Sequence, residues 1–107
     1  MLSSWTTFPI FASVDKKRDL LFYQDYFNEF YSEQTTKVQK KILWTLRVIE
    51  DLERIPEIYF KHLAGTDGLY EISVQSGSNI YRIFCFFDDY NLVVIGHGFQ
   101  KENTKDP

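Results

Sequence analysis

The chain of 107 residues contains only one cysteine and no long hydrophobic run. A single cysteine, Cys85, excludes an internal disulfide framework, so a reducing, cytoplasmic setting is expected. Cys85 lies in the apolar segment IYRIFCFF, where we expect a small buried side chain and not a nucleophile. Spanning a bilayer takes roughly 18 consecutive apolar residues, and no segment approaches that length, so no membrane partner is expected.

Standard catalytic and cofactor motifs are missing as well. The sequence has no P-loop, no dinucleotide-binding glycine pattern, no Cys-x-x-Cys, no His-Glu-x-x-His and no Gly-x-Ser-x-Gly. Two histidines and one cysteine hardly provide a zinc site of His and Cys alone. We therefore expect no metal site and no cofactor. The formal net charge of -3 gives no overall attraction for nucleic acid, so anion binding needs a local group of Lys and Arg.

Aromatic and apolar residues, in contrast, are abundant. The 10 Phe and 7 Tyr, with 44% apolar residues in all, indicate one packed globular domain. The first residues are mildly apolar, and a basic triplet at residues 16–18 follows that stretch instead of preceding it as in a signal peptide. We assign residues 1–19 to an N-terminal arm or extension and residues 20–107 to the domain.

The first half of the domain predicts a strand and two helices. Residues 20–23 suit a short strand, and aromatic residues then recur at helical spacing up to Tyr31. A second helix is predicted to start at an N-cap, Thr35 or Thr36, and to end before Pro56. Its buried stripe should comprise Val38, Ile42, Leu46, Ile49 and Leu52. The first part of this helix is basic and its last turns are acidic, a charge pattern typical of a solvated outer face. The basic residues are Lys37, Lys40, Lys41 and Arg47, and the acidic ones are Glu50, Asp51 and Glu53.

The second half predicts three strands. The segments LYEISV, IYRIFCFF and LVVIGHGF are separated by the short turns QSGSN and DDYN, which indicates an antiparallel meander. The fold class is therefore α+β: an N-terminal strand, two helices, then a three-stranded antiparallel meander, with the helices on one face of the sheet.

Arg82 is the most informative single residue, because a guanidinium inside an apolar strand must pair or face a cleft. Two roles stay open at this point, namely an ion pair with Glu71 across neighbouring strands and a ligand-facing role. Lys101 and Lys105 follow the last strand at a spacing of four and could bind a phosphate beside Arg82.

Three further residues could line such a site. Lys61 and His62 precede the Gly-Thr-Asp-Gly segment and could reach the same edge of the sheet. His97 lies between glycines that permit close backbone approach, and its near-neutral titration makes it available for proton transfer. For each of them a purely structural or solvated role is the simpler alternative.

The segments GLYEI, IYRIFCFF and GHGFQK, with Lys105 and Pro107 after them, resemble the toxins of the RelE/ParE superfamily, in particular the HigB-like, phage-derived branch. The resemblance covers about residues 20–107. It implies a toxin neutralised by a cognate antitoxin, expected to be a small helix-turn-helix protein. HigB-like and RelE-like members cut mRNA in the ribosomal A site, which makes ribosome and mRNA the implied partners, whereas ParE-like members inhibit DNA gyrase.

By position, the resemblance implies that Arg82 contacts the scissile phosphate and that Lys101 and Lys105 supply positive charge or transfer protons. Lys61, His62 and His97 are expected to bind RNA. The reaction, attack of a 2′-hydroxyl on the adjacent phosphorus, needs no metal.

The sequence departs from the family pattern at three places. Ser73 stands where the family strand usually has Arg, and Glu102 stands where a second Lys is usual. Family members generally continue beyond Pro107 into a C-terminal helix, which is expected to be lacking here. The lower positive charge works against binding RNA. It favours an alternative, a catalytically decayed member that only binds an antitoxin or partner.

Overall fold

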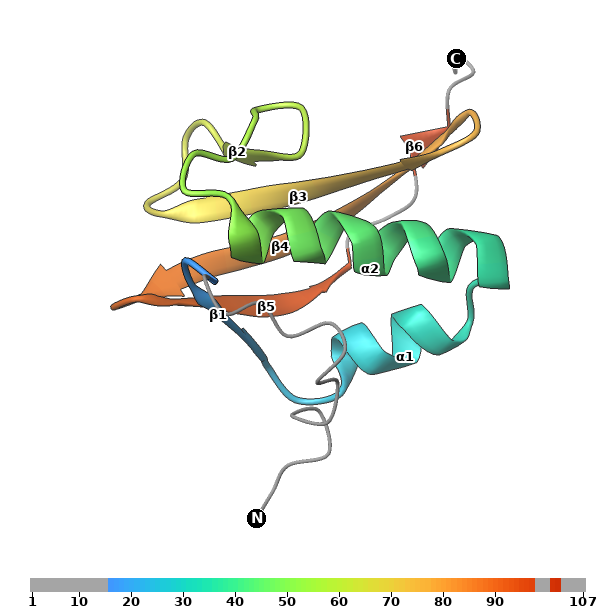
Figure 1. Cartoon of the computed structure of the whole chain (residues 1–107), viewed down its shortest axis with the longest axis horizontal. Helices are drawn as coiled ribbons and strands as arrows, with labels where there is room; N and C mark the ends of the chain where they lie inside the picture. Colours follow the sequence, from blue (N-terminus) through green and yellow to red (C-terminus); the bar gives the residue numbers. More distant parts are fainter. Residues whose placement is uncertain (1–15, 98–100, 103–107) are drawn as a thin grey trace.

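The computed structural model describes residues 16–97 in full and residues 101–102 by their backbone (Figure 1). Its elements are β1 (Asp19–Phe22), α1 (Tyr26–Ser32), α2 (Thr36–Asp51), β2 (Phe60–His62), β3 (Leu69–Ser76), β4 (Asn79–Asp88), β5 (Asn91–His97) and β6 (Lys101–Glu102). The predicted class, with a strand, two helices and an antiparallel meander of β3, β4 and β5, is confirmed. The predicted lack of a C-terminal helix concerns the region that would follow Pro107, which lies outside the described residues.

The strands form one sheet in the order β1-β5-β4-β3-β2, and β6 also pairs with β4. β1 runs parallel to β5, from Asp19 opposite Asn91 to Phe22 opposite Val94, and the remaining pairs are antiparallel. Both helices lie on one side of this sheet, with α2 against β3 and α1 against β5 (Figure 1). The short strands β2 and β6 were not predicted from the sequence. Segments of three and two residues are too short to show the alternation of side chains that indicates a strand.

The core fills the space between the helices and the sheet. Leu20, Phe27, Phe30, Val38, Ile42, Leu46, Ile49, Ile72, Val74, Ile83, Leu92 and Val94 are among its buried residues. Cys85 is fully buried there, as predicted, and burial raises the pKa of its thiol to about 12. A thiol with that pKa stays protonated at neutral pH and is a poor nucleophile.

Helix α2 begins as predicted and ends earlier than predicted. The Thr35 side chain caps it by accepting a hydrogen bond from the Val38 N–H at 3.3 Å. The helix ends at Asp51, where Leu52 turns to extended backbone and is 43% exposed, so the prediction that Leu52 is buried was wrong. The Arg18 guanidinium donates hydrogen bonds to the carbonyls of Ile49, Leu52 and Glu53, which satisfies the end of the helix. No described helix has the length and hydropathy that crossing a membrane requires.

Helix α1 packs closely against β5 at Gly96. A Cβ added to Gly96 would lie 2.9 Å from the Cβ of Tyr26, the first residue of α1. The sequence predicted that glycine beside His97 allows a close backbone approach, and the structure identifies α1 as the element that approaches.

We expect Gly96→Ala to lower the free energy of unfolding by about 1–3 kcal/mol, because the added methyl group overpacks this contact. Urea denaturation monitored by circular dichroism measures the change. Tyr26→Gly removes the opposing Cβ, so Gly96→Ala should be much less destabilising in that background. Equal losses in the two backgrounds would contradict the contact.

Candidate functional site

Side chains alternate between the two faces of the sheet, and the face opposite the helices collects the polar candidates. On β3, Ile72 and Val74 are buried in the core, so Glu71 and Ser73 point to the other face. On β4, Tyr81 and Ile83 are in the core, so Arg82 points to that face too.

Arg82 forms an ion pair with Glu71 on this face. Its Nη1 donates a hydrogen bond to Oε2 of Glu71. The Glu71 side chain is 3% exposed and that of Arg82 25% exposed, so the carboxylate is buried beneath a guanidinium that reaches the surface. The pairing role left open by the sequence is confirmed. The other guanidinium N–H groups make no hydrogen bond to a described residue, so they can still donate to a ligand.

Lys61 lies on the same face. Its register partner on β3 is Glu71, and Glu71 pairs with Arg82 of β4, so two cations flank one buried carboxylate on three adjacent strands. Lys61 is exposed. Ser73 is the register partner of Arg82, so the family's usual Arg would stand directly beside Arg82. The structure thus brings Lys61 and Arg82 together on one face, with one cation fewer than the family pattern.

The two histidines lie on the other side of the sheet. The His62 ring contacts the edge of Tyr70, with ring centroids 5.2 Å apart. The His97 ring stacks on Phe30 of α1, at 4.7 Å and 8° between the ring planes. Phe30 is a buried residue of α1 and points from that helix toward the sheet. His97 therefore faces α1, on the opposite side of the sheet from Arg82. The structure therefore does not group these histidines with Lys61 and Arg82.

Lys101 is placed by its backbone alone. It pairs with Ile80 in the β4–β6 ladder, two residues before Arg82 on β4, and Glu102 pairs with Asn79. β6 thus runs along the same side of β4 as β5, as a site beside Arg82 requires. Lys105 lies outside the described residues.

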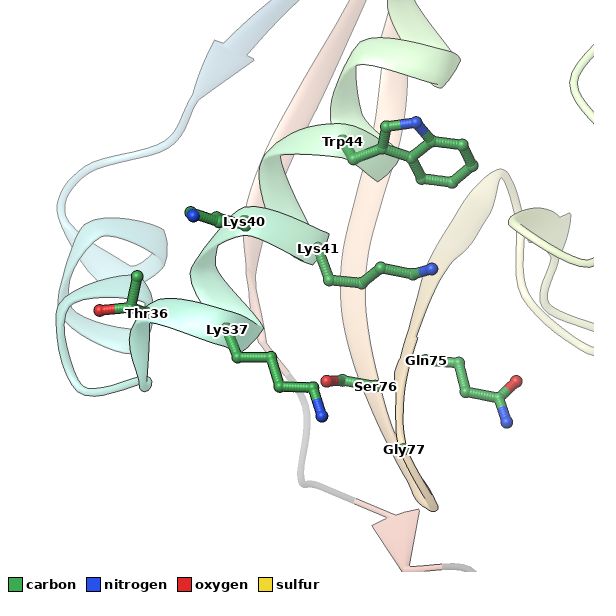
Figure 2. Close-up of a pocket in the computed structure, with 8 residues that line it drawn as sticks. All are labelled: Thr36, Lys37, Lys40, Lys41, Trp44, Gln75, Ser76 and Gly77. Atoms are coloured by element: carbon green, nitrogen blue, oxygen red, sulfur yellow. The ribbon is translucent and has the colours of Figure 1, made fainter.

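A groove between α2 and the end of β3 was missed by sequence reasoning. It is lined by Thr36, Lys37, Lys40, Lys41, Trp44, Gln75, Ser76 and Gly77 (Figure 2). The sequence does carry a signal for it, because Lys37, Lys41 and Trp44 recur at the spacing of one helical face. Only the folded structure shows that the end of β3 lies opposite this face of α2.

Comparison with known proteins places the chain in a family. Residues 29–107 match the family model described as phage derived protein Gp49-like. No curated protein matches the sequence significantly.

Three solved structures share the fold. The first is a chain of the intact E. coli RelBE toxin-antitoxin complex, with a TM-score of 0.58 and 22% identity over 76% of this chain and 94% of that chain. A chain of the Methanococcus jannaschii RelB-RelE antitoxin-toxin complex has a TM-score of 0.54 and 14% identity, over 72% and 86% of the two chains. A chain of the RelE-RelB complex of Pyrococcus horikoshii OT3 has a TM-score of 0.55 and 13% identity, over 84% and 99%.

At these identities the structures show the fold alone, and the family match covers most of the chain. The family match confirms the predicted phage-derived branch, and the structural matches confirm the predicted RelE-like fold. The chain belongs to the family of phage-derived Gp49-like proteins and has the RelE fold.

Proposed function

We propose that this protein is the toxin of a toxin–antitoxin system and that it cuts mRNA on the ribosome in the cytoplasm. Membership of the Gp49-like family and the fold shared with chains of toxin–antitoxin complexes support a toxin with an antitoxin partner. The observation that carries the cleavage proposal is Arg82, which anchors to a buried carboxylate and keeps further N–H donors available on the face that also bears Lys61.

In the proposed reaction, a ribose 2′-hydroxyl attacks the adjacent phosphorus in line with the leaving 5′-oxygen. The new bond joins the 2′-oxygen to phosphorus, the bond to the 5′-oxygen breaks, and the products are a 2′,3′-cyclic phosphate and a 5′-hydroxyl. Arg82 would donate to the phosphoryl oxygens, where negative charge grows in the transition state. Glu71 would hold the guanidinium in place, as a positioning residue, and Lys61 would bind a neighbouring phosphate.

The C-terminal lysines complete the proposal. Lys101, whose backbone β6 places beside β4, and Lys105 would supply further positive charge or transfer the protons between the 2′-hydroxyl and the leaving 5′-oxygen. His62 and His97 have no direct part in this version of the site, because their rings lie on the helix side of the sheet.

A second candidate function is binding to an antitoxin or partner without catalysis. It is favoured by Ser73, which stands beside Arg82 in the register where a second guanidinium is usual, and by Glu102 next to Lys101. If this candidate is right, Ser73→Arg with Glu102→Lys should create toxicity where the natural sequence has none.

The test is to express the full chain in bacteria without an antitoxin, and to measure growth and the 5′ ends of cellular mRNA. We expect growth arrest with cuts inside codons, and relief when the cognate antitoxin, expected to be a small helix-turn-helix protein encoded by the adjacent reading frame, is expressed too. Absence of arrest would overturn the cleavage proposal. DNA damage with intact mRNA would overturn it in favour of gyrase inhibition.

A further inference from the structure

The groove between α2 and the end of β3 concentrates positive charge in a chain whose net charge is -3. None of the described residues that line it is acidic, and three of them are lysines within residues 37–41. In Figure 2, Lys37 and Lys41 extend from α2 toward β3, while Lys40 points to the other side of the helix. The groove therefore offers two ammonium groups on one face.

No acidic side chain of the described residues neutralises these lysines. Among the residues described with side chains, 16–97, no ion pair includes Lys37, Lys40 or Lys41. Like charges four residues apart on a helix are mildly destabilising, as Lys37 and Lys41 are here. An anion bound between them would remove that repulsion.

Trp44 adds an aromatic surface to the same groove. Its side chain is 47% exposed, and the Lys41 Nζ lies 5.0 Å from the centre of the ring system. Tyr59 meets Trp44 edge-on, at 5.5 Å between centroids, which fixes the orientation of the indole. If Lys41 moves to a phosphate, the indole face that it covers becomes available to a flat, unpaired base.

The occupant that uses all of these features is single-stranded RNA. Lys37 and Trp44 are seven residues apart on α2, roughly 10 Å along the axis, so phosphate contacts and a stacked base fall on neighbouring nucleotides. In Figure 2 the Ser76 hydroxyl points toward Lys37, where it can donate to a phosphate oxygen. An acidic peptide would use the lysines but would leave the indole without a flat partner.

We propose that this groove binds single-stranded RNA at a second site, separate from the cleavage site. This inference deepens the proposed function and rests on it. Arg82 points to the face of the sheet opposite the helices, whereas the groove is lined by α2 on the other face. The RNA bound in the groove is therefore not the segment that is cleaved. The groove binds one RNA segment while Arg82 contacts the scissile phosphate of the mRNA elsewhere on the ribosome.

The test uses the full chain and a short fluorescein-labelled RNA with 2′-O-methyl groups, which cannot be cut by 2′-hydroxyl attack. Fluorescence polarisation measures affinity at several salt concentrations. Lys37→Gln with Lys41→Gln should weaken binding about 100-fold, roughly tenfold for each charge-assisted hydrogen bond that is lost. The slope of log K against log salt should become shallower by roughly 1.4, about 0.7 for each lost phosphate contact. Arg54→Glu makes the same change in net charge beyond the far end of α2, and should change little.

Trp44 gives a second readout. In a Trp5→Phe background, which leaves Trp44 as the only tryptophan, the RNA should quench its fluorescence. Trp44→Ala should weaken binding about tenfold, and Trp44→Phe less, because an aromatic ring still stacks. Circular dichroism confirms that the variants fold.

Equal affinity and salt slope in wild type and the double lysine variant would overturn the inference. Binding of polyglutamate to the groove without binding of RNA would also overturn the inference, and would identify an acidic protein as the occupant. The two proposals fail separately. Wild type that binds RNA through the groove but cuts no mRNA overturns only the cleavage proposal, and wild type that cuts but binds RNA independently of Lys37 and Lys41 overturns only the groove.

Discussion

Arg82→Ala should lower the free energy of unfolding by about 3–5 kcal/mol. The cause is Glu71, whose side chain is 3% exposed and whose only described ion-pair partner is Arg82. Truncation of Arg82 leaves this carboxylate buried without its counter-charge, which is worse than removing both charges. A growth assay with Arg82→Ala alone would therefore confuse loss of folding with loss of activity.

The matched control is Glu71→Gln with Arg82→Gln. Two amides can bond to each other across the same strands and leave no buried charge, so this variant should unfold much closer to wild type. Urea denaturation monitored by circular dichroism separates the two cases. Equal destabilisation by Arg82→Ala and by the amide pair would contradict the view that the unpaired Glu71 carboxylate causes most of the loss.

The amide pair is also the variant in which catalysis should suffer most. If Arg82 stabilises the charge that develops on the phosphate, Glu71→Gln with Arg82→Gln should slow cleavage about 10²–10³-fold, the effect of removing one transition-state donor. The measurement is single-turnover cleavage of mRNA on programmed ribosomes, with protein in excess. Saturating protein keeps a change in binding from mimicking a change in the chemical step.

Glu71→Gln alone separates positioning from catalysis. It retains the Arg82 guanidinium and neutralises the anion beneath it, so cleavage should fall far less than in the amide pair. Wild-type rates in the amide pair would rule out Arg82 as a catalytic residue, and equal loss in both variants would assign the effect to Glu71.

Some of this architecture can be read from the sequence, because it depends on long periodic segments. Helix α2 shows its stripe over four turns, and the meander shows alternation with turn residues between strands. Arg82 could be identified because a single charge inside an apolar strand is conspicuous, and Glu71 is the nearest opposite charge on the neighbouring strand. The true end of α2 could not be read, because it depends on Arg18, far away in the sequence.

The side of the sheet to which His97 points shows why the candidate site was harder to predict than the fold. Strict alternation from buried Val94 would point His97 away from the helices. In the β4–β5 ladder, however, Cys85 pairs with Val94 and Phe84 with Gly96, so the register skips Ile95. This bulge shifts the alternation by one residue, and His97 stacks on Phe30 of α1. Gly96 at the bulge is one local signal, but a glycine in a strand also occurs where another element approaches closely, so the sequence alone does not distinguish a bulge from a regular ladder.

The parallel pairing of β1 with β5 has a consequence for how the protein is made. β1 needs the segment from Asn91 to Val94 as its partner, yet it leaves the ribosome long before that segment is synthesised. Contacts between such distant residues form late and slow folding. During translation β3 and β4 can pair with each other, but β1 stays without its partner strand until β5 has emerged. The growing chain should therefore pair β1 only after the segment from Asn91 to Val94 has emerged, which gives a binding partner time to meet the chain first.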